Sequence, residues 1–246
     1  MNKDLSFFTK RLEELNIVLN KRQECQFLKY FDLLVSWNEK INLTAITDFE
    51  DVFIKHFIDS LSFIKAFDSF DDLVKSTEGK TLCDVGTGAG FPGIPLKILL
   101  PDLQVTLFDS LDKRIKFLNC VIDELELDGI TAIHGRVEDL AKDELFREQF
   151  DFATARAVAS LPVLSEYCIP FVKKNGFFIA MKSDKANDEI SLSDNALKIL
   201  GGKIENKYEF DLPGTDLFRV IIRIRKCLNT PNKYPRKAGT PSKNPL

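Results

Sequence analysis

The stretch Asp84–Gly93, which reads DVGTGAGFPG, decides how this chain folds. It follows the apolar run Thr81–Val85, which predicts a buried strand, and it leads into Pro92–Leu100, which predicts a helix. Glycines spaced two and three residues apart let the backbone turn tightly and let a ligand approach it closely. The stretch therefore predicts a strand, a ligand-binding loop and a helix at the start of an α/β domain.

Two ligand-binding patterns overlap in this loop. Read from Gly88, it contains G-x-G-x-x-G, which is typical of loops that hold the phosphates of a dinucleotide. Read from Asp84, it contains D-x-G-x-G-x-G, which is typical of loops that bind S-adenosylmethionine. A lone G-x-G-x-x-G has little specificity, so the residues that follow the neighbouring strands have to decide between the two ligands.

Carboxylates stand at the ends of three predicted strands. Asp84 ends the first strand, Asp109 ends the second (Val105–Phe108), and Glu138 follows the third (Ile130–Ile133). Because the carboxyl ends of parallel strands meet at one crevice, we expect all three acids around one ligand. At ~4 Å and an effective dielectric constant of ~20, one unit charge pair is worth about 4 kcal/mol before desolvation and screening. The acids therefore favour a cationic sulfonium over a pyrophosphate. The structural alternative for Asp84 is an acid bound by the amides of its own loop.

Short apolar runs alternate with helical segments after residue 80, which predicts a parallel sheet. The later strands are expected at Phe150–Ala155, Phe177–Met181, Lys203–Phe210 and Phe218–Ile224, and the later helices at Lys113–Leu125, Leu161–Val172 and Glu189–Leu200. Only a short turn separates the last two strands, so they should form an antiparallel hairpin. The predicted fold class is α/β: a Rossmann-like S-adenosylmethionine-dependent methyltransferase fold with a seven-stranded, mostly parallel sheet that ends in that hairpin.

We divide the chain into three regions. Residues 1–70 carry apolar side chains at helical spacing and predict an N-terminal helical extension packed on the core. Residues 71–230 form the methyltransferase domain. Residues 231–246 form a basic, proline-rich tail, which we expect to lie extended without regular structure.

Composition limits the class of protein further. The chain has 246 residues, of which 44% are hydrophobic and 29% charged, and it lacks an apolar run of the ~18 residues that a membrane span needs. With a start that lacks a signal core, this predicts a soluble cytoplasmic protein. Five scattered cysteines and two histidines argue against a disulfide framework and against a metal site. All 37 acidic groups precede Leu217, whereas eight basic groups and no acid follow. This basic segment from Leu217 to Leu246 either attracts a polyanion locally or simply stays solvated.

The chain resembles, nearly from end to end, the bacterial glucose-inhibited division protein B family of small-subunit ribosomal RNA methyltransferases. The combination of GFPG with Ala155–Ala159 (ARAVA) and the ending Tyr234-Pro235-Arg236 is specific to this family. Further matching motifs are Trp37-Asn38, Ile41–Thr44, His56–Leu61, Asp109-Ser110 with Lys113-Arg114, Arg136–Glu138, and Lys182. Ser183 stands where the family usually has glycine, so the resemblance does not determine the backbone conformation of that turn.

This resemblance implies methylation of N7 of one guanine in the decoding-region loop of 16S rRNA, with S-adenosylmethionine as the methyl donor. By similarity, the donor contacts Gly86, Phe91, the Val137–Glu138 pair at its adenine end, and Arg156. The residue types agree with this. Asp109 suits the ribose hydroxyls, and Gly86, Gly88 and Gly90 let the donor approach the backbone; Asp84 completes the expected set. Phe91 either packs on an apolar part of the donor or staples the following helix, and Arg156 pairs with the donor's carboxylate, with RNA phosphate or with an acid of the protein.

No catalytic acid or base is expected. Guanine N7 has an in-plane lone pair and no proton to lose, so direct attack on the methyl group needs alignment and a dry pocket, which can supply roughly 7–11 kcal/mol. His56 and Asp59 share one helix face, but His56 also borders apolar residues, and we interpret it as a core histidine rather than as half of a dyad.

The partner is expected to be 16S rRNA in an assembling or assembled small ribosomal subunit, because an acidic body suits RNA already bound by proteins. Lys182, Arg236 and Lys237 are the candidate RNA contacts. A surface lysine is the structural alternative for Lys182, and a strap that ties the tail to the body is the alternative for Tyr234–Arg236.

Overall fold

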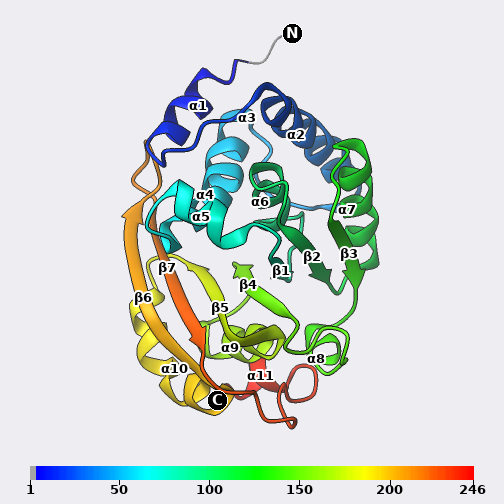
Figure 1. Cartoon of the computed structure of the whole chain (residues 1–246). Coiled ribbons are helices and arrows are strands. Elements are labelled where there is room, and N and C mark those ends of the chain that lie inside the picture. The colour runs from blue at the N-terminus through cyan, green and yellow to red at the C-terminus, as the bar shows by residue number, and fades with distance from the viewer. Residues whose placement is uncertain (1–3) are drawn as a thin grey trace.

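One mixed sheet organises the computed structural model of the chain, which describes residues 4–246. Within them seven strands lie in the order β3-β2-β1-β4-β5-β7-β6 (Figure 1). The strands are β1 Thr81–Val85, β2 Gln104–Asp109, β3 Ile130–His134, β4 Phe150–Arg156, β5 Val172–Lys182, β6 Gly202–Asp211 and β7 Phe218–Lys226. The first five are mutually parallel, and β7 pairs antiparallel with both β5 and β6. The predicted fold class and terminal hairpin are confirmed.

Strand order reverses at β1, which pairs with β2 on one side and β4 on the other. The chain runs outward from β1 through β2 to β3, and then returns to β4 on the opposite side. This reversal opens a crevice outside the carboxyl ends of the strands, where ligands of such sheets bind. The loop after Val85 and the residues after β2, β3 and β4 all reach this crevice.

Helices cover both faces of the sheet (Figure 1). One face carries α1 Ser6–Glu13, α2 Lys21–Ile41, α3 Phe49–Val52, α4 Asp59–Leu61, α5 Phe70–Thr77, α6 Gly93–Leu99 and α7 Asp112–Glu124. The other face carries α8 Val137–Leu140, α9 Leu161–Cys168, α10 Ala186–Leu200 and α11 Thr240–Lys243. Within residues 4–246 no helix combines the length and the apolar character needed to cross a lipid bilayer.

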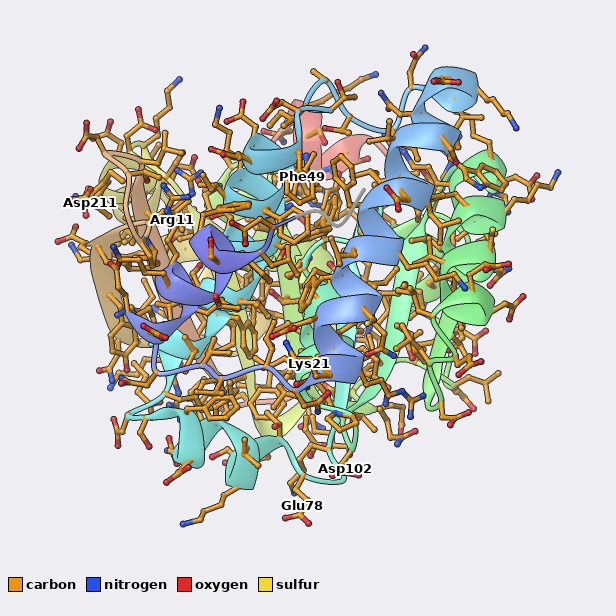
Figure 2. The ribbon with its side chains drawn as sticks, turned by 90° about the horizontal axis from the view of Figure 1, so that it is seen from above. Arg11, Lys21, Phe49, Glu78, Asp102 and Asp211 are labelled. Atoms are coloured by element: carbon orange, nitrogen blue, oxygen red, sulfur yellow. The ribbon has the colours of Figure 1, made fainter. Side chains whose placement is uncertain are left out.

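Phenylalanines join the N-terminal helices to the body. Phe53, in a π-helical turn between α3 and α4, is fully buried and its ring centroid lies 4.7 to 4.8 Å from those of Phe8, Phe49 and Phe57. This cluster is continuous with the apolar side chains of α6, α7 and the sheet. Figure 2 shows α1 and α2 lying over this face, with Arg11 of α1 close to the β6–β7 hairpin, where its guanidinium donates to Gly214 O at 3.4 Å.

The structure differs from the sequence predictions in two segments. The helix expected at Leu161–Val172 ends at Cys168, because Pro170 has no amide hydrogen to donate to a continuing helix. A 3₁₀ turn at Ile169–Phe171, which contains Pro170, leads into β5. The expectation of an extended tail without regular structure is wrong. Residues 240–243 form the short helix α11, and Tyr234 and Pro241 are buried against the body.

Candidate active site

The loop after β1 is closed by its own carboxylate. Asp84 is fully buried, and its Oδ2 accepts hydrogen bonds from Thr87 Oγ1 at 2.6 Å and from Gly93 N at 2.8 Å. Burial raises the pKa of Asp84 to about 6, against the opposing effect of those two hydrogen bonds. Asp84 therefore ties the first turn of the loop to the first residue of α6.

The same contacts answer which ligand the loop suits. In dinucleotide-binding proteins the amides at the start of this helix bind phosphate. Here the amide of Gly93 is taken by Asp84, and the amide of Gly88 donates to Asp109 Oδ2 at 3.0 Å. Negative charge of the protein already lies where a pyrophosphate would have to bind, so the loop suits a neutral or cationic ligand.

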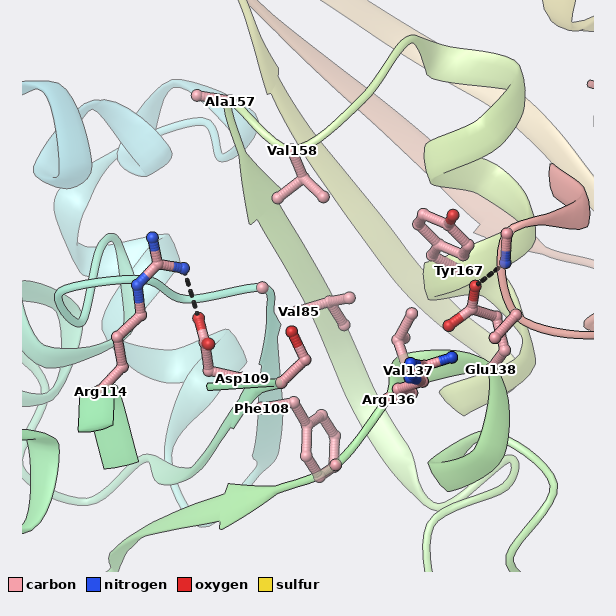
Figure 3. A pocket seen from close by; sticks show the side chains of 15 residues that line it. Val85, Phe108, Asp109, Arg114, Arg136, Val137, Glu138, Ala157, Val158 and Tyr167 are labelled. Carbon is pink, nitrogen blue, oxygen red and sulfur yellow. Dashed lines mark hydrogen bonds and ion pairs between the residues drawn. The ribbon is translucent and has the colours of Figure 1, made fainter. Parts of the chain in front are cut away.

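Two of the three acids expected around one ligand share a cavity. Asp109 and Glu138 line a cavity of about 480 Å³ at the carboxyl ends of the strands (Figure 3), whereas Asp84 is bonded to the first residue of α6 and is not part of that lining. Its Oδ2 is bound by its own loop, as the structural alternative expects, while its Oδ1 is buried without a hydrogen-bond partner. Burial explains the difference, because an aspartate at the last but one position of a central strand faces the helix layer rather than the crevice.

The cavity combines two carboxylates with apolar walls. It is lined by Val85, Gly86, Phe108, Asp109, Ser110, Arg114, Gly135, Arg136, Val137, Glu138, Ala157, Val158, Tyr167, Ala238 and Gly239. Its volume lies in the range of small-ligand sites. Asp109 Oδ2 accepts from Gly88 N at 3.0 Å and pairs with Arg114 at 3.2 Å, whereas Oδ1 accepts only from Leu111 N at 2.9 Å and keeps capacity for a further donor. The lining fits S-adenosylmethionine, because its hydroxyls need acceptors and its adenine needs apolar contact.

Gly86 is the loop glycine that reaches this cavity. Its φ is +70°, a conformation that favours glycine, and a Cβ built on it would lie 3.0 Å from Val158 Cγ2. Any side chain here would push against Val158 and occupy space between the ends of β1 and β4. The predicted pair Val137–Glu138 lines the opposite wall.

The remaining predicted donor residues, Gly88, Gly90, Phe91 and Arg156, lie outside that lining. A Cβ on Gly90 would lie 2.5 Å from Ile94 Cδ1 and 2.6 Å from the Tyr30 hydroxyl, so this glycine lets the loop pack against α2. The Tyr30 hydroxyl donates to Ala89 O. Phe91 is buried and stacks on His56 with ring centroids 4.6 Å apart. These contacts give Phe91 the role of a staple between the loop and the N-terminal helices.

A second, basic pocket of about 310 Å³ adjoins the first at Ala157. It is lined by Asp59, Ser62, Arg156, Ala157, Met181, Lys182, Ser183, Lys185, Glu189, Arg219 and Ile221. Arg156 donates to Asp59 Oδ2 at 2.8 Å and Arg219 to Asp59 Oδ1 at 2.7 Å, so one buried carboxylate holds two guanidinium groups. Lys182 pairs with Glu189 at 2.6 Å and donates to Ala159 O at 2.8 Å. Four cations meet two acids in this pocket, which leaves it net positive.

His56 belongs to the packing between the loop and α2. Its Nε2 lies 2.9 Å from Thr44 Oγ1, and Asp59 is bonded to Arg156 and Arg219 rather than to His56. Burial lowers the pKa of His56 to about 4, helped by the nearby Arg156. The ring is therefore neutral near pH 7, as the interpretation as a core histidine requires.

This burial of His56 predicts a pH-dependent stability. Its pKa falls from 6.5 unfolded to about 4 folded, so the unfolded chain binds the proton first and stability is lost as pH falls from 6.5 to 4. The loss should reach about 3 kcal/mol, since one pKa unit corresponds to ~1.36 kcal/mol. Asp84 acts in the opposite sense, because its raised pKa adds stability as pH falls below 6. We therefore expect the difference in unfolding free energy between the wild type and His56→Phe to shrink by about 3 kcal/mol from pH 7 to pH 4 in urea titrations. A difference that stays constant with pH would contradict a neutral buried His56.

The pocket at a strand-order reversal, its two carboxylates and the antiparallel β7 define the class of S-adenosylmethionine-dependent methyltransferases. Solved structures share this fold. TYW2 of M. jannaschii in complex with AdoMet superposes with a TM-score of 0.51 at 15% identity, over 62% of this chain and 70% of that one. A Klebsiella pneumoniae structure described as a candidate O-methyltransferase superposes with a TM-score of 0.57 at 13% identity, over 91% and 98%.

The particular family follows from sequence relatives. The family model described as rRNA small subunit methyltransferase G matches residues 23–212, and the chain belongs to this family. Proteins named ribosomal RNA small subunit methyltransferase G are 52% identical in Lachnoclostridium phytofermentans, over 99% of this chain and 98% of the relative, and 53% identical in Acetivibrio thermocellus, over 93% and 90%. The resemblance seen in the sequence is confirmed. The chain is a methyltransferase, and S-adenosylmethionine is its methyl donor.

The sequence did not indicate one wall of the first cavity. Ala238 and Gly239 of the tail line it, and Gly239 N donates to Glu138 Oε1 at 3.1 Å (Figure 3). Tyr167 of α9 and Val158 complete the same side. The tail lies about a hundred residues after Glu138 in the sequence, and no spacing pattern connects the two. Glu166, a buried acid on α9, pairs with Arg236 of the tail. This pair shows where the tail docks, but it is visible only in the three-dimensional structure.

Proposed function

We propose that this protein transfers the methyl group of S-adenosylmethionine to N7 of one guanine in the decoding-region loop of 16S rRNA. The observation that carries the proposal is the adjacency of the two pockets. An acid-lined cavity for the donor and a net positive pocket for the acceptor meet at Ala157, at the carboxyl ends of β4 and β5. Family membership supplies the substrate class.

The donor is held by residues of the first cavity. Asp109 accepts the ribose hydroxyls, Val137 and Glu138 contact the adenine end, and Gly86 lets the donor lie close to the loop. Asp84, Gly88, Gly90 and Phe91 act one layer behind, where they hold the loop in shape through the contacts described above. S-adenosylmethionine supplies a methyl group on a sulfonium, which is electrophilic without help from an acid.

The acceptor guanine enters the basic pocket. Lys182 and Arg156 present cationic donors there, and such groups pair with guanine O6 and with phosphate oxygens. A target base must be unpaired or extruded to be reached. Because N7 has no proton to remove, the residues of this pocket orient the base and exclude water, and none acts as a general base.

The substrate is expected to be an assembling or assembled small subunit in the cytoplasm. The body of the chain is acidic, so cations that contact RNA are concentrated locally rather than spread over its surface. Of the two candidate RNA contacts in the tail, Arg236 is engaged with Glu166, whereas Lys237 is exposed and its cation can approach phosphate.

Methyl-labelling of defined substrates tests this function. Purified protein and S-adenosylmethionine with a labelled methyl group should label small ribosomal subunits from a strain that lacks the enzyme, and nuclease mapping should place one N7-methylguanosine in 16S rRNA. Subunits from the parent strain, which already carry the modification, are the control. Label that appears only in metabolites or protein would support a small-molecule or protein methyltransferase instead.

Replacing Asp109 by asparagine should weaken donor binding. The change removes a charged acceptor from a buried hydrogen bond, which costs about 1–3 kcal/mol and corresponds to roughly a 5- to 150-fold rise in the dissociation constant for S-adenosylmethionine. Asp112→Asn is a matched control, because Asp112 is an exposed aspartate three residues away that pairs with Lys116 outside the cavity lining. Calorimetric titration of both variants checks the prediction, and equal affinities would remove Asp109 from the donor site.

A further inference from the structure

Residues 231–246 return from the end of β7 to the donor cavity, where they meet α8 and α9 (Figures 1 and 3). We propose that this tail is a structural wall of the donor site, and that Arg236 is the positioning residue that holds the wall in place. The affinity for S-adenosylmethionine then depends on docking of the tail. This inference rests on the assignment of the first cavity to the donor.

The ion pair between Arg236 and Glu166 anchors the tail. Glu166 of α9 is fully buried, and the guanidinium of Arg236 approaches both of its oxygens, with Nε 3.0 Å from Oε1 and an Nη 2.6 Å from Oε2. The amide of Arg236 also donates to Oε1 at 2.7 Å. A buried carboxylate with a bidentate partner and a backbone donor is satisfied only when the tail is docked.

Further contacts fix the tail before and after Arg236. Arg147 donates to the carbonyl oxygens of Thr230 at 2.7 Å and Tyr234 at 2.9 Å, which holds the chain as it leaves the sheet. Beyond the ion pair, Ser242 of α11 lies with its Oγ 2.9 Å from the Tyr167 hydroxyl. The segment between Arg236 and Ser242 is thus held at both ends, over the cavity.

That segment supplies the wall itself. Ala238 and Gly239 line the cavity, and the Gly239 amide donates to Glu138 Oε1 at 3.1 Å. Gly239 has φ +78°, which favours glycine and turns its amide toward Glu138. The contact fixes one oxygen of Glu138, a residue that is 7% exposed. Because this wall lies beside the residues after β3, beyond the ribose acceptor Asp109, it serves the adenosine half of the donor.

A truncation separates the wall from its anchor. Removing residues 238–246 deletes Ala238, Gly239 and α11 but keeps Arg236, Lys237 and Glu166, so the body should stay folded. We expect the dissociation constants for S-adenosylmethionine and S-adenosylhomocysteine to rise together by at least tenfold in calorimetric titrations, since both carry the same adenosine. Methyl transfer to small subunits should recover at saturating S-adenosylmethionine. The KM for S-adenosylmethionine should therefore rise, with little change in kcat. Lys243→Ala, an exposed tail residue, is the control.

Two further measurements make the inference independent of that truncation. Arg236→Met should weaken donor binding as the truncation does, and Arg236→Lys should restore part of it, because lysine keeps the charge without the fork. In the unmodified protein, S-adenosylmethionine should slow hydrogen exchange of the tail amides at 237–242, since coupling between ligand and tail is reciprocal. The proposal would be overturned if the folded truncated chain bound the donor with a dissociation constant within twofold of that of the full chain. It would also be overturned if the donor did not change the hydrogen exchange of the tail amides.

These readouts are separate from the test of the proposed function. Donor affinity and amide exchange need no RNA, so a chain that binds S-adenosylmethionine through its tail but leaves ribosomal RNA unmethylated would contradict the function alone. A chain that methylates the small subunit with unchanged donor affinity after truncation would contradict the wall alone.

Discussion

Replacing Phe53 by alanine lowers the free energy of unfolding by about 3–5 kcal/mol, the range for deleting a fully buried aromatic side chain. Phe53 has no exposed surface and packs against Phe8, Phe49 and Phe57, so the cavity left behind is surrounded by rings that cannot collapse into it. Urea titration checks the value. Leu192→Ala, whose side chain is 70% exposed on α10, is the control and should change stability by less than about 0.5 kcal/mol.

The same experiment tests how the N-terminal helices relate to the rest of the chain. Their phenylalanine cluster is continuous with the core of the sheet, so we expect one cooperative transition in which far-ultraviolet circular dichroism and tryptophan fluorescence coincide. The single tryptophan, Trp37 of α2, reports on the boundary because its ring lies 5.7 Å from that of Phe117 in α7. Two separate transitions would instead make residues 1–70 an independent folding unit.

Replacing Asp59 by alanine should lower the free energy of unfolding by about 3 kcal/mol. Breaking a buried ion pair by removing one partner costs ~3–5 kcal/mol, and the lower end applies because Arg219 keeps 21% of its side chain exposed. Asp59 holds Arg156 and Arg219 together, so its loss also releases Arg156 from its place at the rim of the acceptor pocket. We expect transfer to small subunits to fall while the affinity for S-adenosylmethionine stays within a few-fold of the wild type.

The control for Asp59 is another aspartate of the N-terminal region. Asp51 pairs with Lys55 one turn away, with both side chains more than a third exposed, and such pairs contribute little. Asp51→Ala should leave stability and transfer nearly unchanged. If Asp59→Ala behaved like Asp51→Ala, the two arginines would be held by other contacts, and the acceptor pocket would not depend on this carboxylate.

The sign of the ligand's charge was predictable from the glycine loop, although one acid acts differently from its expected role. Asp109 and Glu138 line the first cavity, because the ends of parallel strands and the segments after them border the crevice. Asp84 instead accepts from Thr87 and Gly93. It disfavours phosphate by occupying the Gly93 amide at the start of α6, rather than by facing the ligand. Sequence position shows that an acid is near the loop, but not on which side of the backbone its carboxylate lies.

By itself, the sequence determined the features of this protein that depend on local pattern. Alternating apolar runs and helical segments indicated the strands, a mostly parallel sheet and its terminal hairpin, and the motifs GFPG and ARAVA indicated the family. Only the tertiary structure decided which groups pair across long separations. Asp59 meets Arg219, Glu166 meets Arg236, and the Gly239 amide meets Glu138, so that a tail expected to lie extended lines the first cavity. The physical reason is burial. A carboxylate that is enclosed by packing needs a hydrogen-bonding partner, and the fold decides which residue lies close enough to be that partner. The sequence does not show which distant residues the fold brings together.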